Sequence, residues 1–64
     1  MTNGEINLEV AVKALEAGKL NNFETQFVES IKDYDKHDLK NLSKKQYAIL
    51  QDIYKKFHYQ FLVV

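Results

Sequence analysis

The residues that could take part in chemistry are two histidines, two serines and nine carboxylic acids, spread along 64 residues. A general acid–base or nucleophilic site needs such groups held together in one cleft. His37 and His58 stand 21 residues apart, and Ser43 is better used as a helix cap. The acids lie mostly on expected solvent faces, and no phosphate loop, metal motif or nucleophile elbow is present. We therefore predict a protein that is not an enzyme and that carries neither a cofactor nor a metal ion.

Lysines gather in the second half of the chain, where they could contact phosphate groups. The predicted nucleic-acid-binding residues form a basic strip along a loop and the last helix: Lys40, Lys44, Lys45, Lys55 and Lys56. Tyr47 or Tyr59 would add a stacking face at the margin of this strip. Against this interpretation, the chain has no Arg, its net charge is zero, and Asp52 lies within the strip. An ordinary solvated helix face is the alternative.

Aromatic residues provide a second candidate surface. The chain has four Tyr and four Phe, more rings than a small helical core easily buries. The predicted partner-binding residues are Tyr54, Phe57, His58, Tyr59, Phe61 and Leu62. Rings with polar tips suit protein interfaces. The alternative is that these residues complete the core and keep only normal residual exposure.

Composition limits the class of protein. The absence of Cys excludes disulfides and thiolate zinc sites, and a hydrophobic fraction of 45% is typical of a globular domain. No apolar run approaches the length of a membrane span, and the first five residues lack the basic-then-apolar order of a signal peptide. We therefore expect one domain, residues 1–64, in the cytoplasm. So short a chain depends on tight helix packing, self-association or a partner.

The elements that must position these residues are helices, and the last is the clearest. Ser43 and Gln46 have the spacing of a capping box, and Leu42 and Tyr47 that of a hydrophobic staple. Six apolar residues then fall on one broad arc at helical spacing: Tyr47, Leu50, Ile53, Tyr54, Phe57 and Phe61. We predict a helix for residues 43–59.

A middle helix is predicted for residues 22–34. Asn21 with Glu24 forms another capping pair. An apolar stripe follows: Phe23, Phe27, Val28, Ile31 and Tyr34. The polar stretch 35–38 interrupts this period and is interpreted as a loop, from which Leu39 and Leu42 plug the core.

The first segment allows two interpretations. Leu8, Ala11 and Leu15 fit the stripe of a helix over residues 7–17, with Gly18 as its C-terminal cap. The alternation from Ile6 to Val12 fits a strand, whose only available neighbour is the segment 61–64. We favour the helix. The predicted fold is an all-α domain of three helices, the longest C-terminal, with both others packed on its apolar arc; the alternative is a helical pair with a small two-stranded element from the chain termini.

Residues 27–57 carry a pattern that can be compared with known proteins. Phe27-Val28-Glu29-Ser30-Ile31 has the form F-x-x-S-I, and Leu42 to Leu50 has the form L-S-x-K-Q-x-x-I-L. This pattern resembles short helical segments of phage-encoded DNA-processing and accessory proteins. The resemblance implies a small accessory protein that binds and blocks a host enzyme, such as a defence nuclease, or assists replication. It brings no catalytic residues with it.

These observations lead to two functional hypotheses. The first is a non-catalytic protein-binding module, a phage-type accessory or inhibitor, because aromatic residues are in surplus and no active site is evident. The second is a nucleic-acid-binding accessory protein that uses the lysine strip. Homodimerisation through the last helix is compatible with either.

Overall fold

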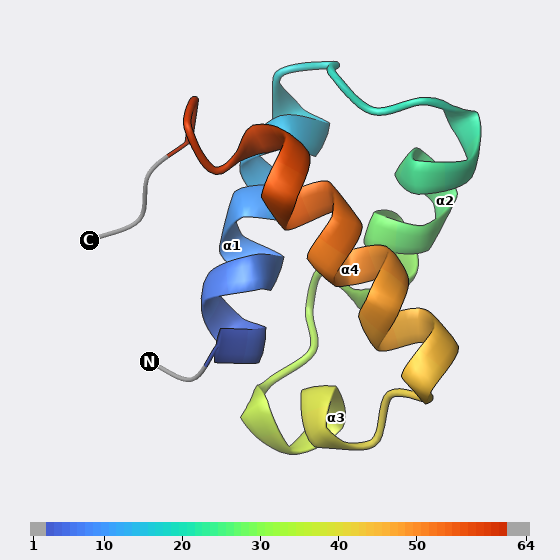
Figure 1. Ribbon diagram of the computed structural model, residues 1–64. Coiled ribbons are helices and arrows are strands. Elements are labelled where there is room, and N and C mark those ends of the chain that lie inside the picture. The colour runs from blue at the N-terminus through green and yellow to red at the C-terminus, as the bar shows by residue number, and fades with distance from the viewer. Residues whose placement is uncertain (1–2, 62–64) are drawn as a thin grey trace.

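The computed structural model describes residues 3–61, which form four helices and contain no strand (Figure 1). The helices are α1 (Asn3–Glu16), α2 (Asn22–Ile31), α3 (Lys36–Lys40) and α4 (Lys44–Phe57). The predicted all-α fold is confirmed, as is the helix favoured for the first segment, and the alternative of a strand there is wrong. The C-terminal helix α4 has 14 residues, the greatest helix length in residues 3–61, which it shares with α1.

The two predicted capping boxes are present and begin α2 and α4 where the sequence indicates. The Asn21 side chain accepts a hydrogen bond of 2.8 Å from the Glu24 backbone N–H, and Glu24 Oε1 accepts one of 3.2 Å from the Asn21 N–H. Ser43 and Gln46 exchange the same pair of bonds at 3.1 and 2.9 Å. Each box satisfies N–H groups that the first helical turn leaves without a carbonyl partner.

The polar stretch 35–38 is not a loop, and this prediction is wrong. The Asp35 carboxylate accepts 2.9 Å hydrogen bonds from the N–H groups of His37 and Asp38, and the Asp38 carboxylate accepts one of 3.3 Å from the Asp35 N–H. This third capping box starts the short helix α3, which places Leu39 in the core as expected. Helix α2 ends at Ile31, three residues before its predicted end.

Helix α1 starts at Asn3, four residues before its predicted start, and ends at Glu16, one residue before its predicted end, with the predicted cap Gly18 just beyond it. Gly18 has a φ of +71°, in the left-handed region that glycine adopts without steric cost. Its N–H bonds to the Leu15 carbonyl at 3.0 Å, and the Lys19 N–H bonds to the Ala14 carbonyl at 3.0 Å. These two bonds are those of a Schellman motif, which satisfies the last carbonyls of α1.

Helix α1 packs against α4, α2 and α3, and α4 crosses in front of it in the view of Figure 1. The expectation that both other helices pack on α4 is therefore wrong, since α2 packs chiefly on α1. The buried cluster nevertheless draws side chains from all four helices: Leu8, Ala11, Val28, Ile31, Leu39, Leu50 and Ile53. Leu42 packs against this cluster from the α3–α4 connection, as predicted.

Two rings of the predicted α2 stripe lie outside the core. The exposed fraction is 63% for Phe23 and 39% for Tyr34. Tyr34 follows the end of α2, and Phe23 lies in its first turn, at the edge of the arc that Val28 and Ile31 bury. Phe27 and the last-helix ring Phe57 do pack against the core. The ends of α2 thus extend beyond what the other helices cover.

Candidate functional site

Three rings form a continuous row where α4 ends. The Tyr54 and His58 rings stack with centroids 5.0 Å apart and planes 13° apart, and the centroids of His58 and Tyr59 are 3.9 Å apart. His58 Nδ1 lies 3.2 Å from the Tyr54 carbonyl oxygen, which holds the imidazole against the last turn. We call Tyr54, His58 and Tyr59 the ring row. Tyr59 is 79% exposed, while the other two members are half-buried.

The remaining predicted partner-binding residues are not part of the ring row. Phe57 packs against the core, and Phe61, also half-buried, lies against it with ring centroids 6.4 Å apart. Leu62 lies outside the described residues. The structure therefore brings together the ring row and assigns Phe57 to packing, because its direction on α4 is that of Leu50 and Ile53.

A polar groove adjoins the ring row between α1 and α4. It has a volume of about 440 Å³ and is lined by Asn3, Asn7, Gln51, Tyr54 and Lys55. Asn7 is only 6% exposed although its side chain is polar. Asn7 is not among the site residues predicted from the sequence. The signal was available: Asn7 lies on the same helical face as Gly4, Ala11 and Ala14, all of which are buried.

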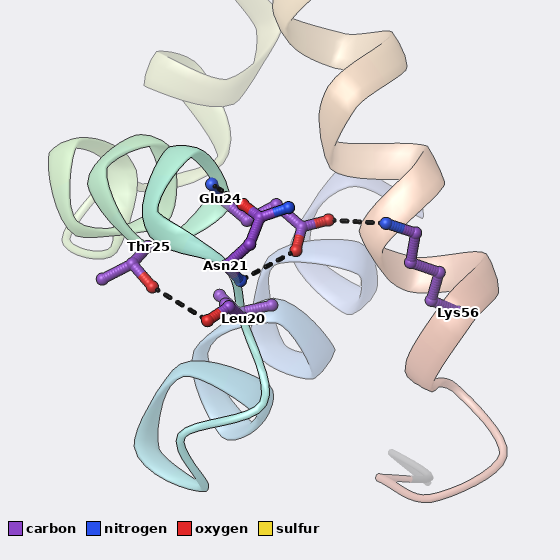
Figure 2. Close-up of polar contacts among 5 residues, drawn as sticks. All are labelled: Leu20, Asn21, Glu24, Thr25 and Lys56. Atoms are coloured by element: carbon purple, nitrogen blue, oxygen red, sulfur yellow. Dashed lines mark hydrogen bonds and ion pairs between the residues drawn. The ribbon is translucent and has the colours of Figure 1, made fainter.

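One lysine of the predicted strip forms an ion pair with another residue of the protein. Lys56 Nζ donates to Glu24 Oε2 at 2.8 Å and ties α4 to the first turn of α2 (Figure 2). The Glu24 side chain is 10% exposed and that of Lys56 is 56% exposed. Burial acts to raise the pKa of Glu24, but the hydrogen bonds from Lys56 and from the Asn21 N–H, with the Lys56 charge, outweigh it and lower the pKa. The hydrogen bond and charge of Glu24 raise the pKa of Lys56.

The other lysines do not form one strip. Lys40 and Lys44 line a groove of about 320 Å³ beside Tyr47, and Lys36 joins Lys40 in an adjoining groove of about 160 Å³. No carboxylate lines either groove among the described residues. We call Lys36, Lys40 and Lys44 the basic cluster. Lys45 is exposed on α4, and Lys55 lies near the far end of that helix.

The opposite edge of α4 has a third groove, which is more apolar. Its volume is about 450 Å³, and its lining residues are Asn21, Phe23, Glu24, Ile49, Asp52, Lys55 and Lys56. The ion pair between Glu24 and Lys56 lies in its wall, so two of the four charged residues that line this groove are already paired with each other.

In comparisons with known proteins, no family model, curated protein or solved structure matches this chain. The resemblance of residues 27–57 to phage accessory proteins stays a prediction. Within residues 3–61, no helix is long and apolar enough to cross a membrane, and no three His or acidic residues are grouped where they could hold a metal ion.

Proposed function

We propose that this protein is a non-catalytic protein-binding module that docks a protein partner through the ring row. One observation carries the proposal: Tyr59 is 79% exposed at the end of a row of contiguous rings. Aromatic residues with a polar tip are enriched in protein interfaces, where the ring is buried and the tip finds a hydrogen bond.

The energetics support a docking role for this end of α4. Burying a large apolar side chain contributes roughly 1.5–3 kcal/mol, so Tyr59 leaves most of that free energy available to a partner. The His58 ring stacks on Tyr54 and lies tilted against Tyr59, and these contacts restrict its rotamers before binding. A partner that covers the row therefore has less side-chain entropy to remove than it would with isolated rings.

The proposed role is that of a cytoplasmic accessory protein or inhibitor of the phage type. The pattern in residues 27–57 supports this part of the proposal. A module that binds and covers a surface needs no catalytic group of its own.

A pair of tyrosines allows a controlled test. A photo-crosslinking amino acid is placed at position 59 in one variant and at position 34 in another, since both side chains are exposed but only Tyr59 belongs to the ring row. The proposal expects one defined partner, identified by mass spectrometry, to crosslink at position 59 and not at 34. Unlabelled wild-type protein should compete for it, whereas Y59A protein should not.

The same experiment contains the results that contradict the proposal. Equal crosslinking at both positions would indicate nonspecific contact. Competition by Y59A as strong as that by the wild type would show that the ring row does not bind the partner. A product whose only component is this chain would show that the row docks a second copy.

Nucleic-acid binding is a second candidate function, and the basic cluster favours it. Three lysines line two adjoining grooves beside Tyr47, and no carboxylate lines these grooves in the described part of the chain. Three phosphate contacts on a single strand predict a slope of about −2 for log affinity against log salt.

This candidate is tested with an oligothymidine by fluorescence anisotropy at several salt concentrations. The doubly substituted variant K40E/K44E should lose binding. The variant K13E/K19E, which changes the net charge equally on α1 and the turn after it, should keep most of it. Undetectable binding at low salt, or equal losses in both variants, would exclude the basic cluster as a specific site.

A further inference from the structure

The amide of Asn7 is buried between α1 and α4 without a protein partner. Asn7 is 6% exposed, and within residues 3–61 its side chain makes no hydrogen bond. No polar side-chain atom in the described residues is both fully enclosed and unpaired. The Asn7 amide therefore keeps its remaining access through the groove that it lines with Gln51 and Tyr54.

Within residues 3–61 the Asn7 amide has no protein partner, yet none of its polar atoms is fully enclosed. Its hydrogen bonds can therefore come only from water or from a group that enters the groove, and an apolar side chain at this position would need neither. Neighbouring positions on this face, Ala11 and Ala14, are fully buried and apolar. The exception points to a group from outside the chain that completes the hydrogen bonds of Asn7.

The lining of the groove defines the chemistry of that group. Asn3, Asn7 and Gln51 each offer two N–H donors and one carbonyl acceptor. A peptide backbone presents the matching pair, one N–H and one carbonyl per residue. Lys55 is the one charged residue in the lining, so an acidic side chain is favoured at that end. The ring of Tyr54 forms the side of the groove that continues into the ring row.

We propose that the groove between α1 and α4 binds an extended acidic peptide segment of the partner. The Asn7 amide pairs with its backbone, Lys55 contacts a carboxylate, and Tyr54 contacts the flanking side chain. This inference rests on the proposed function, because it assigns the segment to the protein that the ring row docks.

The closing experiment uses a small probe with both recognised groups. N-acetyl-aspartate N-methylamide is titrated into ¹⁵N-labelled protein, with the lysine analogue as the comparison probe. The proposal expects saturable shifts of the Asn7 and Gln51 side-chain NH₂ signals with the aspartate probe. N7L should abolish these shifts at Gln51, while Q26L, an exposed amide on α2, should leave them unchanged.

A second variant keeps the test independent of any change in folding. Lys55 lies at the exposed rim, so K55E leaves the interface of α1 and α4 in place. Reversal of its charge should weaken the aspartate probe about threefold and strengthen the lysine probe by a similar factor, the range of an exposed ion pair.

Failure of this inference differs from failure of the proposed function. No saturable shift at high probe concentration, or shifts that N7L leaves intact, would overturn the groove assignment. In that case partner crosslinking at position 59 would still support the module. Saturable shifts without any crosslinked partner would instead uphold the groove and remove the proposed docking through the ring row.

Discussion

The two edges of α4 differ in whether their buried polar groups have hydrogen-bond partners within the protein. On the edge toward α2, the nearly buried Glu24 accepts from Lys56 at 2.8 Å and from the Asn21 N–H at 3.2 Å. On the edge toward α1, the equally buried Asn7 has no hydrogen-bond partner within residues 3–61.

This difference separates a structural role from the binding role that we propose. A buried polar group that is fully paired specifies how two helices sit together. A polar group that lines a groove without a protein partner has no such structural explanation. The ion pair on the edge toward α2 therefore fixes the position of α2 on α4, while we propose that the polar groove on the edge toward α1, which continues into the ring row, is used for recognition.

The largest expected effect on stability comes from a core substitution in α4, which disturbs the packing on both of its edges. Leu50 is fully buried in the centre of α4. L50A should lower the free energy of unfolding by about 3 kcal/mol, because the lost side chain leaves a cavity that the packed helices close only in part. Urea unfolding measures the change. K45A, on the exposed face of α4, is the control and should shift stability by less than about 0.5 kcal/mol.

A smaller effect should come from the paired edge alone. E24Q removes the charge that holds Lys56 and weakens the acceptor of the capping box. We expect a loss of about 1.5 kcal/mol, since hydrogen bonds to charged groups contribute more than neutral ones. E29Q, an exposed glutamate on the same helix, should cost almost nothing. Equal losses in E24Q and E29Q would show that the pairing of Glu24 does not hold the two helices.

The pH dependence of this loss follows from the pKa of Glu24. Its pKa in the folded protein lies below the ordinary value of 4.5, so the unfolded chain takes up the proton first. The contribution of Glu24 is therefore fully present above about pH 4.5 and disappears as the pH falls through the lower, folded-state pKa. Urea unfolding of wild type and E24Q should give converging stabilities below pH 4.5. A gap that stayed constant would contradict the assigned charge.

A substitution at Asn7, on the edge toward α1, should raise the free energy of unfolding rather than lower it. N7L should raise the free energy of unfolding by about 1 kcal/mol, because it replaces an amide that lacks a protein partner with an apolar group of the same branched shape that buries more apolar surface. Thermal unfolding by circular dichroism measures the gain, and A14S, which puts a new polar group on the same buried face, should lose stability. A lower free energy of unfolding for N7L would mean that the Asn7 amide stabilises the fold, as Glu24 does on the other edge.

Features that depend on residues close together in the sequence could be predicted, whereas features that depend on distant residues could not. The capping boxes at Asn21 and Ser43 join residues three apart, so their sequences identify them directly. The box at Asp35 and Asp38 has the same signal, yet it was interpreted as a loop because apolar periodicity was given more weight. Capping chemistry was the better guide for so short a helix.

The ion pair of Glu24 with Lys56 and the burial of Asn7 depend on tertiary structure, so local sequence patterns did not predict them. Glu24 and Lys56 are 32 residues apart, and only the crossing of α4 over α1 brings Lys56 to the first turn of α2. Asp52, four residues before Lys56 on the same helix, is the nearer acid in the sequence, yet Lys56 bonds to Glu24. Asn7 was missed for a related reason, since the face of α1 that is buried depends on where α4 lies.

The finest comparison uses two adjacent lysines. Lys56 bonds to Glu24, while Lys55, next to it on α4, has no bonded partner in the described residues and lines the open groove. K56Q should lower the free energy of unfolding by about 0.5 kcal/mol, because its ammonium is half-exposed and partly screened, and K55Q by less than that. Added salt should reduce the K56Q effect and leave K55Q unchanged. If the two variants lost equal stability, the edge toward α2 would be held by apolar packing around Ile49 rather than by its ion pair.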